Sequence, residues 1–194
     1  MAHQHPISPS HAQRLLDPSR LETQLGEHDL VRLLALRGDE DVIELGSGPG
    51  FYTDRIAALT TGIVYALDIQ PEMLEFYRAR GTPDNVRLVL GDVANLDLPA
   101  AGLDVACSIS TWHESGGSVD LAGLARALRP GGRLVIVDWR KDVGALEKGP
   151  PLEIRFDKEE VTAALSPHFL PVSAENLGQF MFAVVAVRAD LLAD

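Results

Sequence analysis

The stretch DVIELGSGPGFYTDRIAAL, residues 41–59, places three glycines within five positions, between a short apolar run and a segment with helical periodicity. Glycine weakens the interior of a strand or helix by about 0.5–1 kcal/mol relative to alanine. Three glycines so close together therefore indicate a turn that needs unusual backbone dihedrals or that a ligand approaches closely. The surrounding pattern predicts that this turn leads from a buried strand into a helix.

Short apolar runs alternate with amphipathic segments along most of the chain. The runs cover 42–45, 63–68, 86–90, 103–109 and 133–138, and the segments between them include 52–60, 71–80 and 118–130. Runs of this length are typical of parallel strands that are buried on both faces and joined by crossover helices. The last of these helices is expected to end at Arg-Pro-Gly-Gly, because Pro130 cannot continue a helix and Gly131 adopts left-handed dihedrals easily.

The C-terminal part departs from this alternation. A helical pattern at 157–167 is followed by two strand-like runs, 169–177 and 179–187, with a short turn at Gly178. Two adjacent runs with so short a link predict an antiparallel hairpin. The fold class that we predict is therefore α/β: a doubly wound, Rossmann-like sheet of seven mostly parallel strands with a C-terminal antiparallel hairpin.

The chain of 194 residues is expected to form a single domain, with residues 27–188 as its core. Two segments lie outside the predicted sheet, namely residues 1–26, rich in Pro, Ser and His, and residues 140–156. Each is either a surface connection or part of a lid over a site. The histidines between positions 3 and 11 have neither a helical i, i+4 spacing nor a cysteine partner, so disorder is favoured there over a metal site.

Composition argues against several classes of function. A net charge of −11, a pI near 4.9 and the lack of a basic cluster argue against a nucleic-acid partner. The apolar run at 180–187 is far shorter than the roughly 18–20 residues of a membrane span, and the N-terminus has no secretory-signal pattern, so we expect a cytoplasmic protein with no membrane partner. Cys107 is the only cysteine, which excludes an internal disulfide, and its thiol is expected to be buried.

The residues around the glycine turn indicate what kind of ligand it receives. In an open α/β sheet, ligands bind beyond the carboxyl ends of the strands, where such a turn offers backbone N–H groups. A dinucleotide-binding fingerprint needs a third small residue where Phe51 stands, and Glu44 is a poor neighbour for a pyrophosphate. Because a carboxylate favours a nearby positive charge, we predict a cationic ligand. A nicotinamide-dependent oxidoreductase is then a remote alternative.

Four segments together resemble one enzyme family. VIELGSGPGFYT at 42–53 is similar to the E/D-x-G-x-G-x-G motif of the class I methyltransferases that use S-adenosylmethionine (SAM). ALDIQPEML, LGDVANLDLP and ALRPGGRLVIVDW resemble the later motifs of that family, in the expected order. The likeness covers roughly residues 28–188 and is greatest to small type 11 methyltransferases related to the quinone-biosynthesis C-methyltransferases. It implies SAM as the cofactor and an antiparallel seventh strand.

The resemblance also assigns cofactor contacts. It implies that the glycine turn approaches the methionine part of SAM, that Glu44 supports the ammonium group, and that Asp92 faces the adenine amino group. Asp68 should hold the ribose, and its place at the end of the second strand, 20 residues beyond Gly48, independently suits a carboxylate that accepts bonds from both hydroxyls. The expected cofactor-binding set is Glu44, Gly46, Ser47, Gly48, Gly50, Asp68, Ile69, Asp92, Val93 and Ser110.

The acceptor side is less clear from sequence. The segment STWHESGG at 110–117 follows the fourth strand, and His113 is the candidate base, with a pocket-shaping polar role as the alternative. Tyr52, Trp112 and Asp138 are candidate substrate contacts, although Tyr52 also suits helix packing and Asp138 also suits a loop cap. These residues, Trp139 and the acidic composition indicate a small, partly apolar acceptor. The acceptor atom stays open among C, N, O and S.

Two functions are therefore compatible with the sequence. The first is a SAM-dependent methyltransferase acting on a small molecule, with residues 1–26 and 140–156 approaching the methyl group and becoming ordered when substrate binds. The second is a SAM-binding sensor or assembly protein without catalysis, which is suggested by the small size of the chain and the little material available for a lid.

Overall fold

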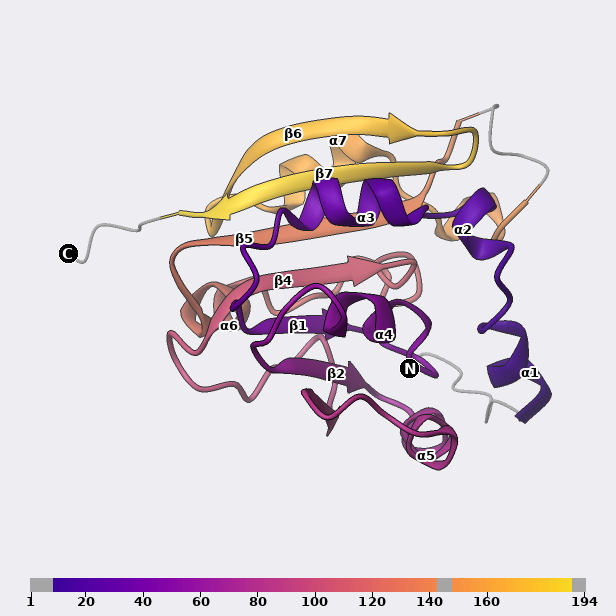
Figure 1. Ribbon diagram of the computed structural model, residues 1–194. Coiled ribbons are helices and arrows are strands. Elements are labelled where there is room, and N and C mark those ends of the chain that lie inside the picture. The colour runs from indigo at the N-terminus through magenta and orange to yellow at the C-terminus, as the bar shows by residue number, and fades with distance from the viewer. Residues whose placement is uncertain (1–8, 143–147, 190–194) are drawn as a thin grey trace.

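A computed structural model describes residues 9–142 and 148–189, and it contains one seven-stranded sheet in the order β3-β2-β1-β4-β5-β7-β6 (Figure 1). The strands are β1 (Val42–Leu45), β2 (Val64–Asp68), β3 (Val86–Leu90), β4 (Leu103–Ile109), β5 (Leu128–Trp139), β6 (Phe169–Leu177) and β7 (Met181–Arg188). The helices are α1 (Pro9–Arg14), α2 (Arg20–Thr23), α3 (Glu27–Leu34), α4 (Phe51–Ala57), α5 (Pro71–Arg80), α6 (Leu121–Ala127), the short 3-10 helix η2 (Leu152–Ile154) and α7 (Lys158–Ala164).

The strand pairing confirms the predicted fold class. β1 pairs in parallel with β2 on one side and β4 on the other, β2 pairs in parallel with β3, and β4 pairs in parallel with β5. β7 is antiparallel to both β5 and β6, so the chain ends in the expected hairpin. The chain winds outward in both directions from β1, which places the switch point at the carboxyl ends of β1 and β4.

Two apolar layers cover the sheet. One contains side chains from α3, α4 and α5, among them Leu30, Ile56 and Tyr77, and the other contains Leu124 of α6 and Val161 of α7. Figure 1 shows α3 and α4 in front of the sheet and α6 and α7 behind it. All four residues of β1 are buried, as expected for a central strand that is covered on both faces.

The boundary between α6 and β5 differs from the prediction. The helix ends at Ala127, and β5 begins at Leu128, so Pro130 and Gly131 belong to the strand. The residue before a proline is disfavoured in the helical region, which ends the helix early. The pairing with β4 shifts between Leu103 and Val105, and Gly131 has a φ of +75°, so the start of β5 is irregular.

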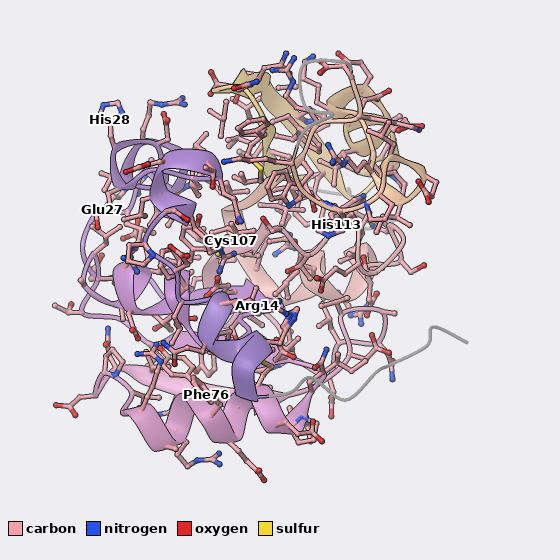
Figure 2. The ribbon with its side chains drawn as sticks, turned by 90° about the vertical axis from the view of Figure 1, so that its right-hand side faces the viewer. Arg14, Glu27, His28, Phe76, Cys107 and His113 are labelled. Carbon is pink, nitrogen blue, oxygen red and sulfur yellow. The ribbon has the colours of Figure 1, made fainter. Side chains whose placement is uncertain are left out.

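Residues 9–25 are more structured than the composition suggested. They form α1 and α2, with Ala12 and Leu25 buried, and α1 packs against α5. The right-hand side of Figure 1 holds the carboxyl edge, and Figure 2 looks onto it, with α1 and its Arg14 between α5 and the region of Cys107 and His113. The histidines at positions 3 and 5 lie outside the described residues. Residues 9–25, with α1 and α2, therefore cross the edge of the sheet where a ligand is expected.

Two features are absent from the described ranges 9–142 and 148–189. No helix there is long and apolar enough to cross a membrane. No group of three or more His, Cys, Asp or Glu side chains there is arranged to hold a metal ion. The thiol of Cys107 is buried, as predicted.

Candidate functional site

The glycine turn lies between β1 and α4 and contains three left-handed residues. Gly46, Gly48 and Gly50 have φ values of +74°, +53° and +88°. The amides of Gly46 and Ser47 donate hydrogen bonds to the carbonyl of Leu67 at 2.8 and 2.9 Å, which joins the turn to β2. Left-handed dihedrals at three positions explain why glycine is needed there.

The three glycines face different surroundings. A Cβ atom on Gly46 would lie 2.3 Å from Oγ1 of Thr111, and one on Gly50 would lie 2.2 Å from the ring of Tyr77. At Gly48 the nearest atom would be Cδ1 of Leu15, at 3.8 Å. The protein's own packing therefore requires Gly46 and Gly50, whereas a Cβ atom on Gly48 would make only an ordinary contact with Leu15.

This difference predicts two distinct mutant phenotypes. Gly50→Ala should reduce the free energy of unfolding by about 2–5 kcal/mol, because it combines left-handed strain with a clash against Tyr77. Gly48→Ala should cost about 1–2 kcal/mol from the backbone alone, and its main effect should be weaker ligand binding. Urea unfolding of both variants measures the difference, and equal losses would contradict this description of the turn.

Asp68 ends β2 and holds the turn from the other side. Its Oδ2 accepts a hydrogen bond from the Gly48 amide at 2.7 Å, and its Oδ1 accepts one from the Gln70 amide at 2.9 Å. Burial raises the pKa of Asp68 above its usual range, against the lowering effect of these amide donors. Each carboxylate oxygen can still accept a second bond, which suits a pair of ribose hydroxyls.

Glu44 lies in β1 beneath the turn and is buried. Its Oε2 accepts a hydrogen bond from Oγ1 of Thr53 at 2.5 Å. Burial raises the pKa of Glu44 to about 8, and the Thr53 bond and the charge of Arg20 only partly offset this effect. The carboxyl group is therefore mostly protonated at neutral pH, and a cation bound nearby would favour its ionised form.

The raised pKa of Glu44 predicts how stability depends on pH. Between about pH 4.5 and 8, the unfolded chain ionises this group while the folded protein keeps the proton, so stability falls as the pH rises through this range. Because glutamine does not titrate, the free energy of unfolding of Glu44→Gln should fall by about 2–4 kcal/mol less than that of wild type over this pH range. Urea unfolding at pH 5, 6.5 and 8 tests this, with the exposed Glu72→Gln as the control; parallel curves for wild type and Glu44→Gln would contradict it.

The expected adenine contacts lie at the ends of β2 and β3. The Ile69 side chain is 42% exposed, Val93 is half-buried, and Asp92 is exposed with its Oδ1 accepting a hydrogen bond from the Ala94 amide at 2.9 Å. The amide of Gly91 donates to the carbonyl of Asp68 at 3.0 Å, which brings this turn beside the ribose position. Exposed apolar area next to a carboxylate is compatible with a ring that carries an amino group.

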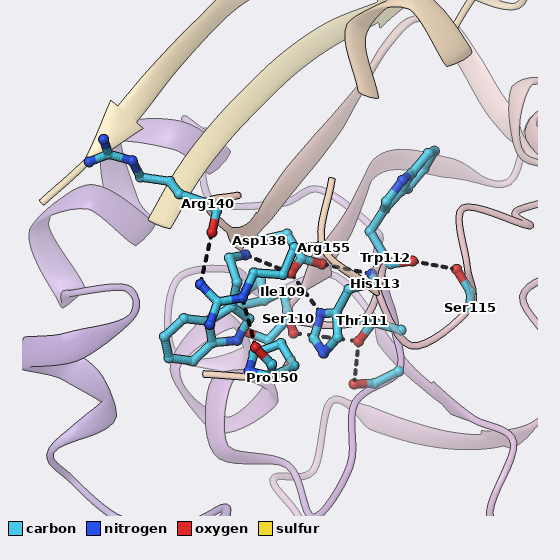
Figure 3. A network of polar contacts seen from close by, with 12 residues as sticks. Ile109, Ser110, Thr111, Trp112, His113, Ser115, Asp138, Arg140, Pro150 and Arg155 are labelled. Atoms are coloured by element: carbon cyan, nitrogen blue, oxygen red, sulfur yellow. Dashed lines mark hydrogen bonds and ion pairs between the residues drawn. The ribbon is translucent and has the colours of Figure 1, made fainter. Parts of the chain in front are cut away.

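His113 and Asp138 form a buried pair at the ends of β4 and β5 (Figure 3). Nδ1 of His113 lies 2.7 Å from Oδ1 of Asp138, and Oδ2 of Asp138 accepts a bond from the His113 amide at 3.1 Å. Burial lowers the pKa of His113, but the hydrogen bond and charge of Asp138 outweigh it, so this pKa lies above its usual range. A carboxylate partner places the proton on Nδ1 and leaves the lone pair on Nε2.

The aromatic candidates are placed differently from the expectation of a pocket lining. The Trp112 side chain is 1% exposed and packs in the apolar layer that contains Leu124. Tyr52 is also buried, and its hydroxyl accepts a hydrogen bond from the Leu25 amide at 3.2 Å. Trp139 packs against Gly149. Large rings gain much free energy from burial, so their presence near a site did not require them to face it.

Part of the segment 140–156 is fastened to the end of β5. The buried Arg155 donates hydrogen bonds to the carbonyls of Pro150 and Arg140, both at 2.8 Å, and of Lys148 at 2.5 Å. Its guanidinium also lies 5.8 Å from the centre of the Trp139 ring. Residues 148–155 are therefore attached to the end of β5 through Arg155, whereas residues 143–147 of the predicted lid lie outside the described residues.

The N-terminal segment contributes two polar residues that sequence reasoning missed. Oε1 of Gln24 accepts hydrogen bonds from Oγ of Ser110 and Nε of Arg20, both at 3.1 Å. The guanidinium of Arg20 lies 4.9 Å from the centre of the Tyr52 ring. Ser110 itself has a φ of +59°, an uncommon value for a residue other than glycine. No motif marked Arg20 or Gln24, because their position depends on how residues 9–25 fold over the edge.

Comparison with known proteins supports the family resemblance. Residues 43–136 match a family model described as a methyltransferase domain. An uncharacterized methyltransferase of Mycobacterium tuberculosis is 29% identical over 158 residues, which cover 76% of this chain and 64% of that protein. The ubiquinone/menaquinone biosynthesis C-methyltransferase of Pseudomonas fluorescens is 29% identical over 123 residues, which cover 60% of this chain and 48% of that protein. The chain thus spans less than two thirds of the length of these relatives.

A solved structure gives a likeness over nearly the whole fold. The crystal structure of a SAM-dependent methyltransferase from Aquifex aeolicus has a TM-score of 0.84 and 28% identity, and the match covers 94% of this chain and 100% of that one. The uncrowded backbone at Gly48, the ribose-compatible Asp68 and the cation-compatible Glu44 fit SAM in charge and in hydrogen-bonding capacity. The chain is similar in sequence and in fold to the class I SAM-dependent methyltransferases, and this likeness implies SAM as its cofactor.

Proposed function

We propose that this protein transfers the methyl group of SAM to a small-molecule acceptor and that His113 acts as the general base. The observation that carries the proposal is the contact between His113 and Asp138. His113 comes two residues after Thr111, whose side chain packs against Gly46 of the glycine turn. This arrangement supports a role for His113 as a base, oriented by a carboxylate, beside the part of the turn where the methionine end of SAM is expected.

The cofactor would be held by residues from three strand ends. Gly48 and its neighbours in the turn would bind the methionine part, Asp68 the ribose, and Ile69, Asp92 and Val93 the adenine, with Glu44 balancing the ammonium charge. SAM, when bound, supplies an electrophilic methyl group on a sulfonium. Alignment and exclusion of water then contribute much of the rate, because the positive charge of the donor disappears in the transfer.

His113 would accept the proton that the acceptor loses. Because Nδ1 contacts Asp138, the basic lone pair of His113 is on Nε2. Asp138 would stabilise the imidazolium that forms when Nε2 takes up the proton. The proton then passes from Nε2 to solvent, which restores the base. This role suits a hydroxyl or an acidic carbon, since an acceptor that is already a nucleophile needs no base. A base of this kind typically contributes about 10²–10⁴-fold to the rate.

The charge of the chain supports a small-molecule acceptor over nucleic acid. The sequence contains 17 Lys and Arg against 28 Asp and Glu. A macromolecular polyanion would be repelled by that excess of negative charge, whereas a small molecule responds mainly to the local groups at the edge of the sheet.

Two measurements test the proposal. Calorimetric titration with SAM, S-adenosylhomocysteine (SAH) and NAD should show binding of both sulfur compounds and none of NAD. Incubation with methyl-labelled SAM and a library of small phenols, carbon acids, amines and thiols should then yield a labelled product. Binding of NAD alone would contradict the cofactor assignment. Tight SAM binding with no product from any acceptor class would instead support the alternative of a non-catalytic SAM-binding protein.

A further inference from the structure

Arg20 is a partly buried cation that forms no ion pair with any residue the structure describes. Its NH1 donates a hydrogen bond to the carbonyl of Leu15 at 2.7 Å, and its Nε donates to Oε1 of Gln24. Within residues 9–142 and 148–189, no carboxylate oxygen lies within ion-pair distance of 4.0 Å. By comparison, the neighbouring Arg55 and Arg80 each form an ion pair, with Glu27 at 3.5 Å and Asp54 at 2.7 Å.

The surroundings of Arg20 make that missing counter-ion costly. Burial lowers the pKa of Arg20, which means that the environment disfavours the cation, and the carboxyl groups of Glu44 and Glu114 raise this pKa only from beyond ion-pair distance. A desolvated charge that lacks a hydrogen-bonded partner of opposite sign reduces stability. An anionic ligand that meets the guanidinium would remove this cost, and Arg is well suited to the two oxygens of a carboxylate.

Arg20 lies where the two reactants are expected to meet. Its guanidinium is 5.0 Å from the centre of the Phe51 ring and 4.9 Å from that of Tyr52, the first two residues of α4 after the glycine turn. Through Gln24 it is also connected to Ser110 at the end of β4. The cation therefore lies between the turn and the strand end that leads to His113.

We propose that Arg20 binds a carboxylate group in this site. The inference rests on the proposed function, which supplies two sources of that group: the α-carboxylate in the methionine part of SAM and a carboxylate on the acceptor. Its position directly above the first turn of α4 favours the first source. Because Arg20 also bonds to Leu15, whose side chain faces Gly48, a bound carboxylate would hold residues 15–25 across the cofactor.

The test compares ligands that differ only in the carboxylate. Wild type should bind SAH about tenfold to a hundredfold more tightly than the decarboxylated analogue of SAH, which is the range for a charged hydrogen bond. Arg20→Gln should bind the two ligands about equally, with its affinity for the analogue unchanged. Arg55→Gln is the matched control, because Arg55 lies over the same Phe51 ring at 4.0 Å but has its own ion pair, and it should keep the preference.

A second arm identifies the source of the carboxylate. Benzoate is titrated into the SAH complexes of wild type and Arg20→Gln, and binding that is lost only in the variant would assign Arg20 to an acceptor carboxylate. Arg20→Lys, which keeps the charge, covers the case in which Arg20→Gln does not fold, and it should retain part of whichever preference wild type shows. If Arg20→Gln keeps both the wild-type preference for SAH over its decarboxylated analogue and the wild-type binding of benzoate, the inference about Arg20 is wrong and the proposed function is unaffected. Failure of wild type to bind SAH overturns the proposed function as well.

Discussion

His113→Gln is expected to lower kcat by about 10²–10⁴-fold while changing the affinity for SAM by no more than about threefold. Glutamine keeps a polar side chain at this position but has no basic lone pair of similar strength. The buried Asp138 would also lose the ring nitrogen that it now contacts at 2.7 Å. Turnover with an acceptor found in the library, together with calorimetric titration of SAM, separates the two quantities.

The pH profile gives an independent measure of the same role. A base must be unprotonated, and the pKa of His113 lies above its ordinary value of 6.5, so the rate should fall as the pH decreases through a pKa above 6.5. His28→Gln is the control, because the His28 side chain is 90% exposed. A His113→Gln enzyme with wild-type turnover would show that His113 only shapes the pocket.

The second large effect is expected at Asp68. Asp68→Ala should weaken SAM binding by about 2–4 kcal/mol, because it removes charged hydrogen bonds to the ribose hydroxyls in a partly buried place. The structure adds a second cause, since Asp68 also holds the Gly48 amide at 2.7 Å and so sets the position of this part of the turn. Calorimetric titration with SAM measures the loss.

Two further variants separate these contributions. Asp68→Asn keeps the size of the side chain but loses its charge, so it should bind SAM more weakly than wild type and more tightly than Asp68→Ala. Asp97→Ala changes an exposed aspartate in the loop after β3 and should leave the affinity unchanged. A folded Asp68→Ala protein with the wild-type dissociation constant would refute the ribose assignment.

The elements that could be predicted are those whose cause is local. Strands such as Val42–Leu45 and Val86–Leu90 agree with their apolar runs, and α5 agrees with the periodic segment at 71–80. The end of α6 was wrong by a few residues because the effect of Pro130 on the residue before it prevailed over the apolar periodicity. Asp68 was predicted from the family resemblance and independently from its position, since the end of a strand next to a parallel neighbour determines which edge a residue occupies.

Groups that depend on long-range packing were not predicted as arrangements. His113 and Asp138 were both candidates, but nothing in a separation of 25 residues indicated that they pair. Trp112 was expected in a pocket and instead packs in the core, because the direction of a side chain in a loop follows from the apolar space available to it. Arg20 carried no signal, since its role depends on α2 lying over the first turn of α4.

The sequence by itself determined the alternation of strands and helices, the left-handed turn at the end of β1 and the carboxylate at the end of β2. Each of these follows from the backbone preference or periodicity of a few consecutive residues. Only the tertiary structure decided which glycine of the turn has room for a Cβ atom, which carboxylate contacts His113, and that Arg20 is partly buried with no carboxylate partner among the described residues. Those properties are set by contacts between residues that are distant in the chain, and such contacts exist only once the sheet and its covering helices have packed together.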